Sequence, residues 1–175
     1  MKAEDVMTRR VVACRADTEL AHAARLMWDN DCGAIPVVDS DDHVVGILTD
    51  RDACMSAYFQ GRSLRDLRAS TCMASQVVTC RPADSAVDVA RLMAEHRVRR
   101  IPVTDDSGRL IGIVSLGDLL GAAARAGGKK KKLIQEAAIE SLTRICERDA
   151  REVQPALPAG KSEGARSRKR AGKTQ

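Results

Sequence analysis

Hydrophobic residues recur in the same order twice along the first 120 residues of this chain. In each copy a short β-branched run, at 11–14 and at 77–80, predicts a strand, and apolar residues at helical spacing follow it. Two more apolar runs flank a turn rich in Asp, Ser and Gly, which predicts a β-hairpin at 35–48 and again at 101–114. Each copy therefore predicts strand, helix, strand, strand, helix, a mixed α/β (α+β) fold.

Helix-start residues precede both predicted helices. Asp17 and Thr18 precede the first, and Ser85, followed three residues on by Asp88, precedes the second. Such side chains accept a hydrogen bond from the free N–H groups of the first helical turn. The apolar positions that follow at helical spacing are Leu20, Ala23, Ala24, Met27, Val87, Ala90 and Met93.

The two copies are an internal repeat with a fixed offset. Shifted by 66 positions without a gap, residues 3–52 fall on residues 69–118 with 17 identical pairs in 50 positions. A unit of about fifty residues buries too little surface to be stable alone, so we expect the copies to stabilise each other. The predicted organisation is listed in chain order: a first repeat at 1–58, a linker at 59–68, a second repeat at 69–124, a linker with an amphipathic helix at 125–153, and a disordered basic tail at 154–175.

Each hairpin runs directly into a hydroxyl residue followed three positions later by an acid. These pairs are Thr49 with Asp52 and Ser115 with Asp118. One interpretation is a capping box at a helix start. The other is a ligand site, because a helix start attracts anions and a carboxylate can accept hydrogen bonds from a ribose diol.

These residues resemble the cystathionine-β-synthase (CBS) domain. The resemblance rests on the Ile-Pro-Val-x-Asp segments at 35–39 and 101–105 and on the segments at 46–52 and 112–118, and it covers residues 2–122. It implies a stand-alone CBS pair of the hypoxic-response or stress type, with two βαββα lobes in a pseudo-twofold arrangement. Two clefts would bind AMP, ADP, ATP or S-adenosylmethionine as a regulatory ligand, with no cofactor required. The resemblance also implies a homodimer formed through the helices, where we expect Met27, Trp28 and Met93 to be surplus to the core.

The resemblance also implies which residues would bind the ligand. Asp52 and Asp118 would hold the ribose, and Thr49 and Ser115 would face the phosphate. Backbone beside the Ile-Pro steps would contact adenine, which assigns Ala34, Ile35, Pro36, Arg100, Ile101 and Pro102. The end of the first strand would add Thr79, with Ala13 as its weaker counterpart.

The two expected clefts differ in charge. Arg51 lies between Thr49 and Asp52, where its guanidinium could bind phosphate, whereas Gly117 takes its place in the second copy. Arg100 and its neighbour Arg99 precede the second Ile-Pro step, where the first copy has Gly and Ala. These arginines could instead form only an exposed basic surface. Our hypothesis is that both clefts form and that at least one is weak or empty.

The net charge of +5 comes from the C-terminal part of the chain. Residues 1–120 carry 15 Lys+Arg against 18 Asp+Glu, and residues 121–175 carry 14 against 6. One interpretation of the basic tail is that it serves solely to keep the protein in solution. The other is that it makes weak contacts with nucleic acid or an acidic protein. The lysine run at 129–132 would oppose a helix dipole and is interpreted as linker, together with the small residues at 121–128. Without a long apolar run or an apolar leader we expect a cytoplasmic protein with no membrane contact.

Catalytic chemistry finds little support in the sequence. A glycine-rich phosphate loop is absent, and the three histidines do not form a recognisable set with a nucleophile, so we expect no enzyme. The six cysteines lack C-x-x-C spacing and are expected to be reduced, most of them as core residues. The alternative is a metal or redox site that involves Cys14, Cys32, Cys80 or His96.

Overall fold

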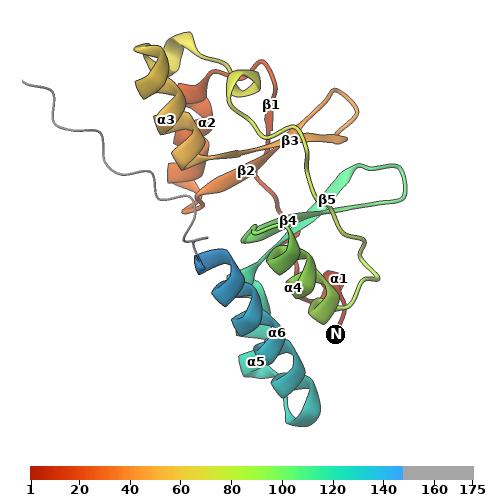
Figure 1. The fold of residues 1–175 in the computed structure, drawn as a ribbon. Helices are drawn as coiled ribbons and strands as arrows, with labels where there is room; N and C mark the ends of the chain where they lie inside the picture. The colour runs from red at the N-terminus through yellow and green to blue at the C-terminus, as the bar shows by residue number, and fades with distance from the viewer. Residues whose placement is uncertain (148–175) are drawn as a thin grey trace, which may run out of the picture.

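The computed structural model describes residues 1–147 and arranges the two repeats as two similar lobes (Figure 1). The elements of the first lobe are β1 (Cys14–Arg15), α2 (Leu20–Asp29), β2 (Ala34–Val38), β3 (Val44–Thr49) and α3 (Asp50–Gln60). Those of the second are α4 (Ala86–Glu95), β4 (Arg100–Thr104), β5 (Leu110–Ser115) and α5 (Leu116–Arg125). The remaining elements are α1 (Ala3–Val6), the 3-10 helices η1 (Leu64–Asp66) and η2 (Ala69–Thr71), and α6 (Gly128–Cys146). The predicted mixed fold of two lobes is confirmed.

The two hairpins are built alike and touch at their turns. Strands β2 and β3 pair antiparallel, as do β4 and β5, and both ladders shift register at the equivalent place, after Val37 and after Val103. Between the hairpin turns, the Val44 N–H donates to the Gly108 carbonyl at 3.3 Å and the Leu110 N–H to the Asp42 carbonyl at 2.9 Å. These backbone hydrogen bonds join the two sheets at one end.

Each lobe is completed by the segment that precedes the other lobe. Ala3 and Met7 lie in the core of the second lobe, and Thr8 forms a bridge to β5. In the same way Leu67 and Ala69 lie in the core of the first lobe, and Ala74 forms a bridge to β3. The chain thus crosses between the lobes twice, so neither lobe can form its whole core alone.

Glycines at equivalent positions allow these crossing segments to approach the sheets. A Cβ on Gly46 would lie 2.6 Å from the Met73 Sδ, closer than real atoms approach. A Cβ on Gly112 would collide in the same way with Met7. The repeat therefore keeps a glycine in each hairpin because a methionine from the crossing segment packs directly on it.

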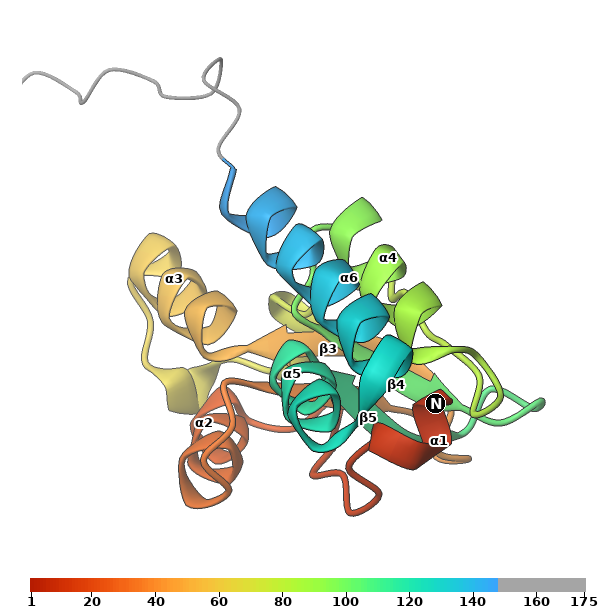
Figure 2. The ribbon, with the colours of Figure 1, turned by 90° about the horizontal axis from the view of Figure 1, so that it is seen from below.

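Helix α6 distinguishes the lobes. It packs against α4 and α5 of the second lobe, where Ile134 and Ala138 are buried (Figure 2). Figure 2 shows α2 and α3 of the first lobe without such a cover. Met27 and Met93 are both buried in their lobes, so the expectation that they are surplus to the core is wrong; Trp28 is exposed as expected.

The first strands are shorter than predicted. Strand β1 begins only at Cys14 and pairs parallel with β2, and the run at 77–80 forms a single bridge, from Cys80 to Val103. The reason is the crossing of the chain, since it can pair with a sheet only once it has entered that lobe. The first predicted helix start is also wrong, because α2 follows Glu19 and the Thr18 hydroxyl accepts a turn hydrogen bond from the Arg15 N–H. Ser85 caps α4 as predicted.

The predicted linker at 121–132 is helical. Helix α5 continues to Arg125, and α6 begins at Gly128 and includes the lysine run. Lysines at a helix start cost a fraction of a kcal/mol each, about 0.3–1 kcal/mol before screening, whereas burial of Ile134 contributes about 1.5–3 kcal/mol. Because the dipole effect is screened and confined to the first turn, packing of Ile134 and Ala138 on the second lobe outweighs it. The predicted tail at 154–175 lies outside the described residues.

Candidate functional site

A cleft of about 340 Å³ lies between the two lobes. Four segments line it: the crossing segment before β1, the α2–β2 loop, the start of β4, and the junction of β5 with α5. The lining residues are Thr8, Arg10, Val11, Val12, Asn30, Asp31, Cys32, Ala34, Arg100, Ile113, Ser115 and Asp118. Its size and its mixture of apolar and polar groups are typical of a small-molecule site.

Ser115 and Asp118 form one polar wall of the cleft. Asp118 Oδ2 accepts hydrogen bonds from the Ser115 N–H at 2.8 Å and from the Ser115 hydroxyl at 2.6 Å, and the Ser115 hydroxyl accepts one from the Asp118 N–H at 3.1 Å. This is the predicted capping box of α5. Within the described part of the chain, Asp118 Oδ1 accepts no hydrogen bond, so this oxygen can serve a ligand in the cleft.

Two arginines bring positive charge to the same cleft. Arg10 comes from the crossing segment and Arg100 from the start of β4. Neither forms an ion pair with a carboxylate of residues 1–147. Asp31 supplies a carboxylate to the same cleft. Two guanidinium groups beside the start of α5 favour a bound anion, because arginine binds phosphate in a bidentate manner and a helix start carries positive potential.

The cleft combines predicted residues from both copies. Ala34 of the first lobe lies opposite Ser115 and Asp118 of the second, with Arg100 beside them. The side chains of Ile35 and Ile101 point into the cores and are fully buried, so only their backbone could meet a ligand. The predicted residues that do not line this cleft are Thr49, Arg51, Asp52, Ile35, Pro36, Thr79, Ile101 and Pro102.

Thr49 and Asp52 form the same capping box in the first lobe. Asp52 Oδ2 accepts from the Thr49 hydroxyl at 2.7 Å and from the Thr49 N–H at 3.1 Å. The 66-residue offset relates this box to Ser115 and Asp118, but its surroundings differ in charge. Where the described cleft has Arg10 and Asp31, the related positions hold Gln76 and Arg97, whereas Ala34 and Arg100 are each other's counterparts.

Several lining residues were missed from the sequence. Val11 and Val12 belong to the predicted first strand, and Thr8 and Arg10 are part of no motif in the sequence. The chain crossing brings them to the second lobe, where Thr8 bridges to Ile113. The usable signal was the repeat itself, which extends back to residue 3 and so includes the crossing segment.

The cysteine alternative is not supported. Cys14 and Cys80 lie in the cores of different lobes, and burial raises the pKa of the Cys14 thiol to about 11 and that of Cys80 to about 12. Both remain protonated at neutral pH, whereas metal binding and nucleophilic attack need the thiolate. Among the described residues, the one group with three close metal-type ligands is Asp39, Asp41 and His43 in the first hairpin turn. Asp39 Oδ1 accepts the N–H groups of Asp41 and His43 at 2.9 Å, so the turn itself accounts for this cluster.

Within residues 1–147, the helices are too short or too polar to cross a lipid bilayer.

Known proteins share this arrangement. The family model of the CBS domain matches residues 3–56 and 64–125. Over 116 residues the chain is 39% identical to the CBS domain-containing protein YhcV of Bacillus subtilis. The aligned region covers 66% of this chain and 81% of that protein. Over 117 residues it is 32% identical to Hypoxic response protein 1 of Mycobacterium tuberculosis, with coverage of 67% and 81%. The crystal structure of CBSX2 in complex with AMP has a TM-score of 0.62 at 26% identity and covers 71% of this chain and 96% of that one.

Proposed function

The chain belongs to the CBS domain family, as a tandem pair of CBS domains, and on this basis we propose that it is a regulatory module that binds an adenine nucleotide in the cleft between its lobes. The observation that carries the proposal is the convergence of Arg10, Arg100 and the Ser115–Asp118 capping box on one cleft. The complex of the similar CBSX2 with AMP supports the class of ligand.

Each part of a nucleotide has a matching group in this cleft. The phosphate would lie between the two guanidinium groups and the Ser115 hydroxyl at the start of α5. The ribose diol would donate to Asp118 Oδ1. Adenine would pack on the apolar side chains of Val11, Val12 and Ile113.

Charge favours a phosphate-bearing ligand over S-adenosylmethionine. S-adenosylmethionine carries a sulfonium, an ammonium and one carboxylate, a net positive charge, whereas Arg10 and Arg100 outnumber Asp31 in the cleft. Like charges so placed raise the cost of binding. We therefore rank AMP, ADP and ATP above S-adenosylmethionine for this cleft.

The regulatory step follows from which segments line the cleft. The ligand would touch the α2–β2 loop of the first lobe and the β5–α5 junction of the second. A ligand shifts a conformational equilibrium only as far as it binds one state more tightly. Here it would favour the spacing of the lobes at which both sets of contacts form.

A thermal-shift experiment on the full chain tests the proposal. A nucleotide at a hundred times its dissociation constant should add about 2.7 kcal/mol of stability and raise Tm by several degrees, with a smaller shift for S-adenosylmethionine. Asp118→Ala should weaken binding about tenfold to a hundredfold, because a hydrogen bond to a charged group contributes about 1.5–3 kcal/mol. The matched control Asp52→Ala removes the same cap in the other lobe and should leave the shift intact. A parent protein that shows no shift with any nucleotide would refute the proposal.

Tail-mediated contact with nucleic acid or an acidic partner remains a prediction, because residues 148–175 lie outside the described part. If it occurs, binding to DNA should weaken steeply as salt is raised.

A further inference from the structure

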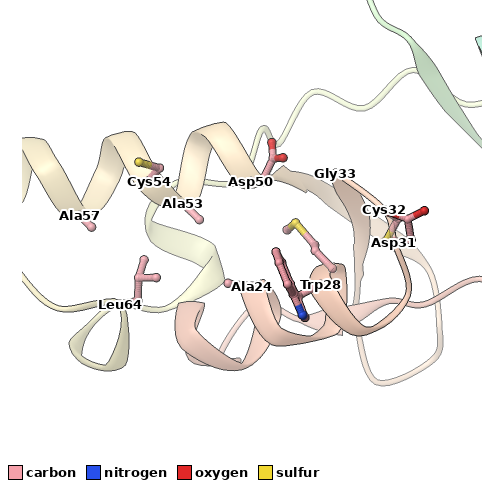
Figure 3. Close-up of a pocket in the computed structure, with 11 residues that line it drawn as sticks. Ala24, Trp28, Asp31, Cys32, Gly33, Asp50, Ala53, Cys54, Ala57 and Leu64 are labelled. Carbon is pink, nitrogen blue, oxygen red and sulfur yellow. The ribbon is translucent and has the colours of Figure 1, made fainter.

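An open groove of about 470 Å³ lies between α2 and α3 of the first lobe. Figure 3 shows Ala24 and Trp28 of α2 on one side of it and Ala53 and Ala57 of α3 on the other. The Trp28 side chain projects beside the groove and is 83% exposed. A recess of this size next to an exposed aromatic ring can hold a few apolar side chains.

The equivalent groove of the second lobe is filled by the chain itself. The counterparts of Ala24, Trp28 and Ala57, shifted by 66 positions, are Ala90, Ala94 and Ala123. These three alanines lie on α4 and α5 and are buried, and α6 packs against both helices. Within residues 1–147, one groove is thus covered by a later segment of the chain and its counterpart is open.

Helix α6 leads the chain toward the open groove. Two residues separate it from α5, so it runs back antiparallel to α5, toward the cleft at which α5 begins. It has 19 residues against the 10 of α5, and at 1.5 Å per residue it extends about 13 Å further. Figures 1 and 2 both show its C-terminal end, drawn in blue, as the part of α6 nearest to α3. Glu147 then leaves the helix in an extended conformation, with φ −65° and ψ 110°.

The end of the groove that faces α6 is acidic. Asp31 and Asp50 line the groove at the end away from Leu64. Asp31 also lines the cleft next to the start of α5, which places this end on the side of α6. Both carboxylates are exposed, and no cation of residues 1–147 forms an ion pair with either. Such an end favours an occupant that brings positive charge.

The sequence after α6 has the matching chemistry. Residues 148–158 are Arg-Asp-Ala-Arg-Glu-Val-Gln-Pro-Ala-Leu-Pro, and their two prolines favour an extended polyproline conformation with three residues per turn. Every third side chain then shares an edge. One edge carries Arg148, Arg151 and Leu157, the next carries Ala150, Val153 and Ala156, and the third carries Asp149, Glu152, Pro155 and Pro158. Two adjacent edges therefore offer cations followed by apolar groups, with the acids on the third.

We propose that residues 148–158 fold back into the α2–α3 groove of the same chain, with the arginines at its acidic end and Val153 beside Trp28. The seven residues from Cys146 to Val153 reach about 23 Å when extended, so the segment can cross to the first lobe. Val153 would follow Arg151 by about 6 Å at 3.1 Å per residue, and Cys54 follows Asp50 along α3 by about 6 Å. Pro-rich segments bind aromatic-lined grooves in this extended form.

The docked segment would also act on the nucleotide cleft, because Asp31 and Cys32 line both the groove and the cleft. An arginine next to Asp31 offsets its negative charge and so favours a bound phosphate. This consequence rests on the proposed function, whereas the docking does not. By reciprocity, a chain with the segment released should bind AMP about fivefold more weakly, at the low end of typical coupling between sites.

Fluorescence of the full chain without nucleotide tests the docking. Trp28 is the only tryptophan, so its emission and its quenching by acrylamide report on the groove. Arg151→Glu places a carboxylate next to Asp31 and Asp50, and should move the emission to longer wavelength and increase the quenching. The matched control Arg168→Glu makes the same charge change beyond the docked segment and should leave both at the parent values.

Equal changes in the two variants, or no change in either, would overturn the proposal. A parent emission that shifts on dilution would overturn it as well, because the occupant would then come from another molecule. Weaker AMP binding in Arg151→Glu than in Arg168→Glu supports the coupling, and equal binding refutes the coupling alone. A parent that binds no AMP refutes the proposed function and leaves the docking intact.

A disulfide can locate the segment in the groove. Cys54 is exposed and lines the groove. In Val153→Cys, oxidation with diamide should join the new thiol to Cys54 within one chain, which mass spectrometry of the peptides detects. The control Thr174→Cys, 21 positions further along, should not form this link. Equal linkage in both variants, or linkage of Val153→Cys solely to other cysteines, would overturn the proposal.

Discussion

The hairpins of the two lobes are nearly interchangeable, whereas the helix faces are not. Both hairpins share one register and one register shift, and each has a methionine packed on its glycine. On the helix face, Ala94 is 8% exposed under α6, whereas its counterpart Trp28 is 83% exposed. The comparison teaches that contacts which hold the two lobes together are retained in both copies. The helix surfaces, which α6 covers in the second lobe alone, have diverged.

The surroundings of the two capping boxes show the same divergence on a smaller scale. Both lobes keep the capping box of a hydroxyl and an acid. Ala34 and Arg100 occupy equivalent positions, so the charge next to the two boxes is different. Substitutions in the two lobes should therefore have similar effects where packing is shared and different effects where it is not.

Removal of the α6 anchor should have the largest effect on stability. Ile134→Ala empties a site that is 3% exposed between α6 and the second lobe, and should cost about 2–4 kcal/mol of the free energy of unfolding. Urea denaturation measures this loss. The control Ile139→Ala changes the same residue type on the outward side of the same helix and should cost less than about 0.5 kcal/mol. Equal losses in both variants would mean that α6 does not dock as described.

Methyl groups on the two hairpin glycines should be about equally harmful. Gly46→Ala and Gly112→Ala each press a Cβ onto a methionine side chain and should cost about 1–3 kcal/mol. In a Met7→Ala background the cost of Gly112→Ala should fall, because the colliding atoms are gone. Unfolding free energies of the four proteins in this cycle give the coupling. A cycle with no coupling would contradict the direct packing of Met7 on Gly112.

The smallest effect concerns acid stability, where the lobes should again behave alike. The His43 N–H bound to Asp39, and the Ser107 hydroxyl bound to Asp105, hold the pKa of each carboxyl below its ordinary value of 3.8. Because the folded pKa is lowered, each contributes stability that is present above the ordinary value and is lost as pH falls through the folded one. Asp39→Asn and Asp105→Asn should therefore each flatten the fall of Tm below about pH 4. If Tm of the variants falls with pH as steeply as that of the parent, the hydrogen bonds of Asp39 and Asp105 do not contribute to acid stability.

Sequence patterns were sufficient for the parts of the fold that depend on local chemistry. The hairpins follow from two apolar runs with a turn between them, and the starts of α3 and α5 follow from Thr49 and Ser115 with their acids. The resemblance also led to Ala34, Arg100, Ser115 and Asp118, which the cleft brings together.

Non-local packing explains the features of the fold that the sequence patterns did not predict. The crossing of 1–8 onto the second lobe depends on Met7 meeting Gly112, 105 positions away in the chain, and periodicity carries no such information. Likewise, the lysine run at the start of α6 argues against a helix when read alone. Only the groove between α4 and α5 explains why the helix forms there.

Titration calorimetry of the full chain with AMP tests most directly whether the two capping boxes differ in ligand binding. The account predicts one binding event per chain, lost in Asp118→Ala and kept in Asp52→Ala with its affinity changed less than about threefold, the factor that 0.6–0.7 kcal/mol would give. Two equal and independent sites per chain, or a single site lost in Asp52→Ala instead, would contradict it.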